Sequence, residues 1–173
     1  MRLVRVGEVP PEVLEFLAWT LSEDGVFALA EGEPLAVADF AYDVGRDQWN
    51  ALLLLDALHT RLDEAGGKLL GIAGFDLFLP IMTHVYGAAE TGGAAAILST
   101  YRLRPEYTGG PPDADLFLSR CRKEALHELG HTLGLVHCRN SACVMSFSSA
   151  VEAGDLKRMS TAGARRRLGK GLA

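Results

Sequence analysis

The sequence is poor in cysteine, has no long apolar run and carries no excess of positive charge. Three cysteines in 173 residues are too few for the dense disulfide framework of a small secreted domain. No apolar run approaches the roughly twenty residues of a transmembrane helix, so we expect no membrane span. The net charge of −5 gives no general attraction to nucleic acid, which we do not expect as a partner.

The composition of the chain is otherwise that of an ordinary globular protein. Hydrophobic residues make up 49% of the chain and charged residues 23%. A chain of this length can bury a core, and we expect one domain over residues 1–173, with a monomer favoured. The segment Arg2–Val6 alternates like a strand and lacks the apolar centre of a secretory signal, so we expect a cytoplasmic location.

Apolar spacing and turn residues predict alternating strands and helices. Strands are expected at residues 2–6 and 68–74, helices at residues 12–21, 47–65 and 113–133, and short strands or a hairpin at residues 26–30 and 35–38. Residues 87–93 are expected to be a connector of small residues and residues 94–103 an extended segment. Asp113 is the expected N-cap of the last helix. This order predicts an α/β (α+β) fold.

Residues 127–137 read H-E-x-x-H-x-x-G-x-x-H, which is the spacing of a hydrolytic zinc site. His127 and His131 are four residues apart and would share one face of a helix. Gly134 would end that helix in a left-handed conformation, and the turn would bring His137 round as a third ligand. Three protein ligands leave one tetrahedral position open, which is typical of a catalytic zinc.

Glu128 follows the first histidine and is placed to contact water on the metal instead of the metal itself. Zinc lowers the pKa of bound water to about 7, and the carboxylate can take its proton and pass it to a leaving group. H-E-x-x-H alone also occurs by chance on buried helices, but the glycine and third histidine make chance a poor explanation. The residues therefore predict zinc-dependent hydrolysis of an amide.

The chain resembles the metzincin zinc peptidases at this motif, and its continuation is similar to the archaemetzincins (archaelysins). Cys138, Cys143 and Met145 complete the archaemetzincin pattern HExxHxxGx(3)Cx(4)CxM. The resemblance extends upstream through residues 76–80 and 99–106. It implies a compact metzincin-like zincin domain, in which a twisted mixed sheet lies above an active-site helix and Met145 forms a Met-turn below the metal. It also implies a peptide or protein substrate.

The chain departs from the family pattern after the methionine. Archaemetzincins continue with seventeen residues and CxxC, but the corresponding positions here are Gly163 and Arg166. We therefore expect one catalytic zinc and no second, structural zinc site. Cys138 and Cys143 are then left as free thiols, as a bridged pair, or as a pair of which one member is bridged to Cys121.

The resemblance also directs attention to the strand that binds the substrate. In metzincins, a strand at the upper rim of the cleft pairs with the extended peptide, and an exposed edge has the unpaired groups to do so. The candidates in this sequence are Ala95, Ala96, Ile97, Leu98, Ser99 and Thr100. The alternative is that they form an ordinary inner strand.

Two other classes of function stay open beside the peptidase. The first is a non-catalytic module that binds peptides and keeps zinc for its shape. The second is a zinc-dependent RNA-processing hydrolase, which Glu128 and the acidic charge disfavour. His59, His84, Tyr101 and Tyr107 have no metal spacing, although the two tyrosines and His84 are candidates to border a cleft.

Overall fold

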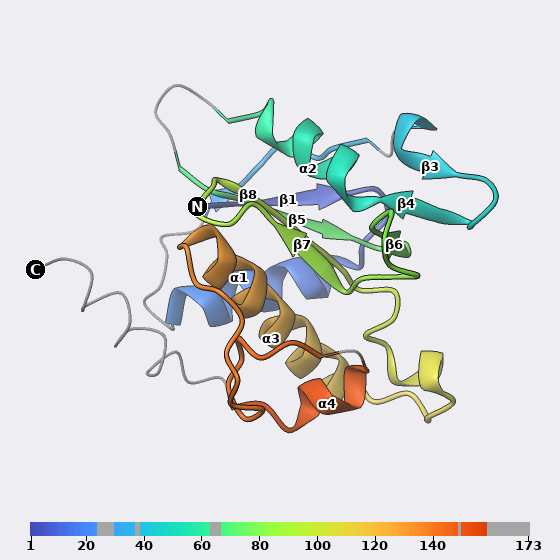
Figure 1. The fold of residues 1–173 in the computed structure, drawn as a ribbon, viewed down its shortest axis with the longest axis vertical. Helices are drawn as coiled ribbons and strands as arrows, with labels where there is room; N and C mark the ends of the chain where they lie inside the picture. Colours follow the sequence, from blue (N-terminus) through green and yellow to red (C-terminus); the bar gives the residue numbers. More distant parts are fainter. Residues whose placement is uncertain (24–29, 37–38, 63–66, 149, 159–173) are drawn as a thin grey trace, which may run out of the picture.

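The computed structural model describes residues 1–23, 30–36, 39–62, 67–148 and 150–158, which form a central sheet with helices on both faces (Figure 1). In chain order the elements are β1 (Arg2–Val6), α1 (Pro11–Glu23), β2 (Ala30–Glu31), η1 (Asp39–Ala41), β3 (Tyr42–Asp43), β4 (Gln48–Asn50), α2 (Ala51–His59), β5 (Leu69–Ala73), β6 (Leu77–Phe78), β7 (Gly87–Ala89), β8 (Ala95–Ser99), η2 (Pro105–Thr108), α3 (Ala114–Thr132) and α4 (Val151–Asp155). The predicted mixed α/β class is confirmed.

The main sheet has the strand order β2-β1-β5-β8-β7. The first four strands are parallel, and β7 pairs antiparallel with β8 at one edge. Strands β5 and β8 are buried along their whole length, as expected for parallel strands that are covered on both faces. A smaller sheet of β3, β4 and β6 lies beside it.

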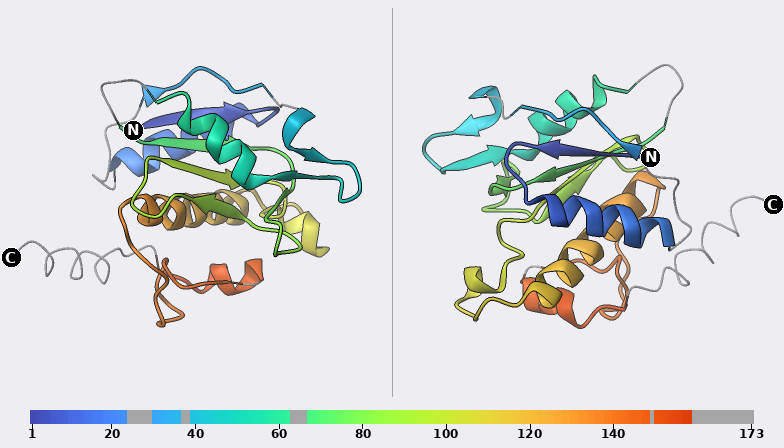
Figure 2. Two further views of the ribbon diagram at one scale, coloured as in Figure 1. Left: turned by 45° about the horizontal axis from the view of Figure 1, so that its top comes forward. Right: turned by 180° about the vertical axis from the view of Figure 1, so that it is seen from behind.

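The helices divide between the two faces of the main sheet. Helix α2 covers one face, whereas α1 and α3 cover the other (Figure 2). Gly71, in the centre of β5, lets α2 approach closely, because a Cβ there would lie 2.7 Å from Leu58 Cδ1. Two apolar clusters result, one on each side of the sheet, and their burial from water stabilises the fold.

An ion pair joins two of the stretches that carry the family resemblance. Asp76, which precedes β6, accepts hydrogen bonds from Arg102 Nε and Nη2 at 2.7 and 2.6 Å. Its carboxylate also accepts a hydrogen bond from Gln48 Nε2 at 2.8 Å. The bidentate pair therefore fixes the segment after β8 to the smaller sheet.

Two boundary predictions were wrong. The predicted helix over residues 47–65 begins only at Ala51, because Gln48–Asn50 pair in the smaller sheet and the Asn50 side chain caps the helix through Leu52 N at 3.0 Å. It ends at His59, and residues 63–66 lie outside the described residues.

Residues 26–30 and 35–38 were expected to form short strands or a hairpin, and the described residues among them form strand pairs with β1 and no hairpin. Ala30 and Glu31 pair with β1 in parallel, and Leu35 forms a parallel bridge with Val6. This segment therefore continues along one edge of β1, and a hairpin would need antiparallel pairing. Residues 26–29 and 37–38 are outside the described part of the chain.

The strand expected at the free edge of the sheet is an inner strand. Residues 95–99 form β8, which lies between β5 and β7, and residues 95–100 are all buried. Residues 87–89, predicted as a connector, form the edge strand β7 instead. Three small residues carry little strand signal, so their pairing was decided by the neighbouring β8. None of the described helices is long and apolar enough to cross a bilayer.

Candidate metal centre

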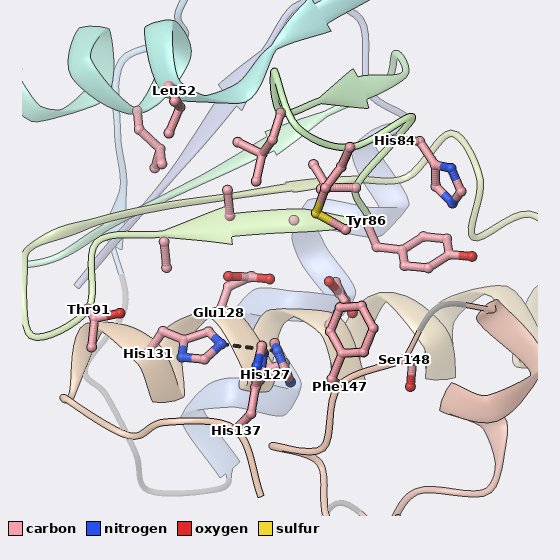
Figure 3. A pocket seen from close by; sticks show the side chains of 18 of the residues that line it. Leu52, His84, Tyr86, Thr91, His127, Glu128, His131, His137, Phe147 and Ser148 are labelled. Carbon is pink, nitrogen blue, oxygen red and sulfur yellow. Dashed lines mark hydrogen bonds between the residues drawn. The ribbon is translucent and has the colours of Figure 1, made fainter.

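Helix α3 places two histidines side by side above the chain that follows it. Its N-terminus is capped as predicted, with the Asp113 carboxylate accepting a hydrogen bond from Leu116 N at 2.9 Å. Near the other end, His127 and His131 project from successive turns of the same face. Figure 3 shows both imidazoles pointing towards His137, which comes from the segment after the helix.

Gly134 produces the turn that brings the third histidine to the other two. It has a φ of 81°, and its N–H donates to the His131 carbonyl at 2.8 Å. Leu135 N–H donates to the Gly130 carbonyl at 3.0 Å, which completes a Schellman motif. One ligand atom of each histidine then lies within 4.8 Å of the others.

Hydrogen bonds hold two imidazoles in the orientation that a metal needs. His127 Nδ1 donates to the Val144 carbonyl and His131 Nδ1 to the Leu135 carbonyl, each at 2.8 Å. In the neutral rings both Nε2 atoms then carry lone pairs, yet they lie only 3.1 Å apart. A cation placed against both nitrogens removes this conflict, so the residues fit a zinc ion.

The environment keeps the first histidine neutral. Burial lowers the pKa of His127 to about 4, and only the hydrogen bond to Val144 opposes this effect. Burial also lowers the pKa of His137, although its side chain is exposed to solvent. Neutral imidazole is the form that binds metals, and the exposed His137 leaves the site open on one side.

Glu128 lies beside the histidine cluster under strand β7. It is 4% exposed, and burial, followed by the nearby Glu124 carboxyl, raises its pKa. A Cβ at Gly87 would lie 2.7 Å from both Cγ and Oε1 of Glu128. The edge strand therefore approaches Glu128 closely only because residue 87 has no side chain.

Two charged residues that we did not predict also border the site. Glu124 is one turn before Glu128 on α3, and the two side chains are hydrogen-bonded. Lys157, which is 8% exposed, donates a hydrogen bond from Nζ to the Ser146 carbonyl. Burial lowers the pKa of Lys157 and the nearby Glu124 raises it. The sequence could have indicated Glu124, because it is four residues before Glu128 on the same helix. No local pattern placed Lys157 at the site.

Met145, which was expected to form a Met-turn, is buried against helix α3. Its side chain is 2% exposed, and a Cβ at Gly130 would overlap its sulfur. The Met145 carbonyl accepts a hydrogen bond from Cys138 N at 2.8 Å, and Ser146 N–H closes a turn on the Cys143 carbonyl at 2.9 Å. Met145 thus packs against Gly130, the residue that directly precedes His131 on α3.

The structure draws no disulfide among the three cysteines, all of which lie in the described residues. Cys138 and Cys143 are partly exposed and are hydrogen-bonded to each other, whereas Cys121 is buried in the core. Burial raises the pKa of Cys121 to about 12.

A cavity of about 490 Å³ joins these groups into one cleft. It runs from the three histidines and Glu128, past the edge strand β7, to helix α2 (Figure 3). His84 and Tyr86 lie at one end of it, with their rings in edge-to-face contact. Tyr101 and Tyr107 contact each other outside the cavity lining, and His59 pairs with Glu90 on the surface.

The free edge of the sheet faces this cleft. Tyr86 and Glu90 use their backbone groups to pair with Ser99 and Ala95 of the neighbouring chain segment. Because hydrogen-bonded pairs alternate along an antiparallel ladder, the N–H and C=O groups of Gly87 and Ala89 point away from β8. The edge that can accept another strand therefore belongs to β7.

A mixed sheet above a helix that carries H-E-x-x-H, with a third histidine after a glycine turn and a buried methionine below, defines a metzincin-like zinc metallopeptidase. The chain matches the sequence model of Peptidase family M54 over residues 39–164. It is 42% identical to an archaemetzincin of Methanocaldococcus jannaschii over 153 residues, which are 88% of this chain and 82% of that protein. It is 40% identical to an archaemetzincin of Pyrococcus abyssi over 163 residues, or 90% and 86% of the two chains.

Solved structures agree with these sequence matches. An archaemetzincin from Archaeoglobus fulgidus, crystallised with malonate, superposes with a TM-score of 0.75 at 35% identity, covering 92% of this chain and 94% of that one. An archaemetzincin from Methanopyrus kandleri gives a TM-score of 0.81 at 34% identity, covering 98% and 96%. The chain belongs to peptidase family M54, the archaemetzincins. It is a zinc-dependent metallopeptidase that acts on peptide or protein substrates.

Proposed function

We propose that His127, His131 and His137 are the zinc ligands and that Glu128 is the general base of peptide hydrolysis. The observation that carries this assignment is the convergence of the three imidazoles beside a buried carboxylate. The hydrogen bonds of His127 and His131 to backbone carbonyls support it, because they direct the free nitrogens towards a common point.

Zinc in this position supplies a Lewis acid for the substrate carbonyl and lowers the pKa of water to about 7. Glu128 takes a proton from the attacking water and delivers it to the departing amine. Burial raises the pKa of Glu128 and so makes its carboxylate a stronger base towards that proton than an ordinary glutamate. The Met145 side chain supports the helix beneath the ligands by packing on Gly130.

The substrate is proposed to bind as an additional strand along β7. The outward N–H and C=O groups of Gly87 and Ala89 provide hydrogen bonds that do not depend on the substrate sequence. Antiparallel pairing would carry the peptide along the cavity and past Glu128. In this proposal strand β7 takes the substrate-binding role that was predicted for residues 95–100, because β7 covers that strand.

Three further assignments complete the proposal. We take residues 1–173 as one domain, active as a monomer on peptides and not on nucleic acid, in line with the net charge of −5. The single-zinc stoichiometry is part of it, because the sequence has no cysteine after Cys143 to build a four-thiolate site. The cytoplasmic location stays a prediction.

The test combines metal analysis with isosteric substitution. Glu128→Gln should keep one zinc per chain and lose about 10²- to 10⁴-fold in peptide hydrolysis, because only the proton acceptor is removed. His131→Ala should lose the zinc. The matched control is Glu12→Gln, an exposed position on α1 away from the cleft, and it should match the wild type. Full activity of Glu128→Gln would contradict the proposed mechanism.

A further inference from the structure

The cleft extends well beyond the catalytic groups, and its far side is apolar. Six residues from α2, the segment between β6 and β7, and β7 itself line this side: Leu52, Leu55, Leu79, Met82, Val85 and Ala88. We call this set the apolar wall. Figure 3 shows Leu52 on the opposite side of β7 from Glu128, with the cavity continuous between them.

The apolar wall is open to solvent at its mouth and closed at its base. Leu52 is 52% exposed, whereas Leu55, one turn further along α2, is only 6% exposed. Isolated exposed leucines are common on protein surfaces. Leu52 differs because it borders a cavity whose base is already apolar, so a ligand side chain could enter without burying a polar group of the wall.

Most ionisable residues of the cavity come from outside the segments that form the apolar wall; the exception is His84, which directly precedes Val85. They come from α3, from the chain after it and from one loop position: His84, Glu124, His127, Glu128, His131, His137 and Lys157. His84 contacts Tyr86 at the end of the cleft. The cleft is therefore divided by β7 into a charged catalytic side and an apolar side.

The strand geometry of β7 decides which substrate residues meet the apolar wall. Ala88 packs with the apolar cluster on the α2 side of the sheet, and Ala89 packs with the cluster on the α3 side. In an antiparallel pair, residues directly opposite each other project to the same face. The peptide residue opposite Ala88 therefore projects to the α2 side, towards the apolar wall.

The direction of the peptide relative to Glu128 follows from the same strand. Gly87 lies against Glu128, and further along the chain Gly92 N–H donates to the His131 carbonyl at 2.9 Å. Strand β7 thus runs from the Glu128 end of the cleft towards His131. An antiparallel peptide runs the opposite way, so its residue opposite Ala88 lies on the amino-terminal side of the residue opposite Gly87.

We propose that the apolar wall is a specificity subsite for a large apolar side chain, such as Leu, Ile, Met or Phe. That side chain belongs to the first or second residue on the amino-terminal side of the scissile bond. The inference rests on the proposed peptide hydrolysis and names the substrate class that the site prefers. A pocket of this kind discriminates against a charged residue because none of the six apolar side chains of the wall can pair with a charge.

The experiment starts with zinc-loaded wild-type protein and a pool of acetylated, randomised peptides, whose cleavage products are sequenced by mass spectrometry. Cleavage should be enriched in peptides that have a large apolar residue either one or two positions before the scissile bond. A pair of peptides with Leu or Lys at that position should then differ at least 10-fold in kcat/KM. Equal cleavage of the two peptides would overturn the proposal.

Two neighbouring leucines of α2 provide a matched pair of variants. Leu52→Asp places a charge at the mouth of the wall and should reduce the Leu-over-Lys preference by about 10-fold or more. Leu53→Asp is the control, because Leu53 is 41% exposed but does not line the cavity. It should keep the wild-type preference; identical behaviour of the two variants would remove Leu52 from the subsite.

A binding measurement separates this inference from the proposed function. Zinc-loaded Glu128→Gln is titrated with the same two peptides carrying a fluorophore, and binding is followed by anisotropy. If the wild type cleaves no peptide, the proposed hydrolysis fails, but about 10-fold tighter binding of the Leu peptide would still support the subsite. Equal binding of the Leu and Lys peptides would overturn it.

Discussion

The side chain of Glu128 lies directly against Gly87, so that a Cβ at residue 87 would be 2.7 Å from Cγ and Oε1 of the carboxylate. The same Cβ would be 2.8 Å from the Ile97 carbonyl oxygen of the neighbouring strand. A side chain at residue 87 would therefore be too close both to Glu128 and to the neighbouring strand β8. This contact couples the position of the substrate-binding edge to the position of the proposed general base.

Gly87→Ala should lower kcat by about 100-fold, because a displacement of roughly 1 Å at a reacting group has an effect of this size. Zinc content should stay at the wild-type value, since the close contacts of the added Cβ are with Glu128 and Ile97 and not with the three histidines. The matched control is Gly154→Ala, where a Cβ has no neighbour within 4 Å. Steady-state kinetics with unchanged activity in Gly87→Ala would show that the contact has no catalytic consequence.

Gly130→Ala should destabilise the fold by about 1–3 kcal/mol, as expected for an extra methyl group in a packed interior. The cause is Met145, whose sulfur would overlap the new Cβ. In a Met145→Ala background the same substitution should instead be neutral or stabilising by up to about 1 kcal/mol, because alanine favours a helix over glycine.

Urea unfolding of the four proteins in this cycle measures the coupling between the two residues. The sign of the Gly130→Ala effect should differ between the two backgrounds. An equal loss of stability in both would show that the conflict lies elsewhere, for example with Leu135, whose Cδ1 would be 3.5 Å from the methyl carbon of the alanine.

Removal of zinc should lower the stability of the fold as well as its activity. A ligand that binds only the folded state stabilises it by about 4 kcal/mol when its free concentration is 1,000 times Kd. Thermal denaturation with and without a chelator measures this difference. His137→Ala should abolish most of it, whereas His84→Ala, which is outside the three-histidine cluster, should retain it. A zinc effect that survives His137→Ala would exclude that residue from the ligands.

Alkylation should distinguish the three cysteines. Cys138 and Cys143 are partly exposed and should react with iodoacetamide in the folded protein at pH 8. Cys121 should react only after unfolding, because it is buried and its pKa is raised to about 12, so its thiolate is scarce at that pH. Peptide mass spectrometry under non-reducing conditions reads out all three. A linked Cys138–Cys143 peptide would show that the pair is oxidised.

Much of the candidate site could be predicted because it is local in the sequence. His127 and His131 are one helical turn apart, Gly134 needs a positive φ and Asp113 precedes a helix, so geometry within a few residues determines each assignment. These predictions were confirmed as local structure. The likeness to archaemetzincins was also visible in the sequence, through the residues after His137.

The strand at the free edge of the main sheet, in contrast, could not be predicted from local sequence. Residues 95–99 have the apolar character of a strand, and a strand signal does not tell whether a neighbour will cover it. The covering residues 87–89 are Gly-Ala-Ala, which have little preference for a strand of their own. The hydrogen bonds offered by β8 therefore decided both which residues pair and which residues form the free edge.

The sequence by itself determined the metal chemistry and the helix that carries it, because both depend on spacings within a single turn or two of chain. Tertiary structure decided the rest of the cleft: Gly87 lies over Glu128, and Leu52 faces the same cavity as His131. These residues are distant in the sequence and have no motif in common. Their proximity results from packing α2 and α3 on opposite faces of one sheet, a property that no local pattern encodes.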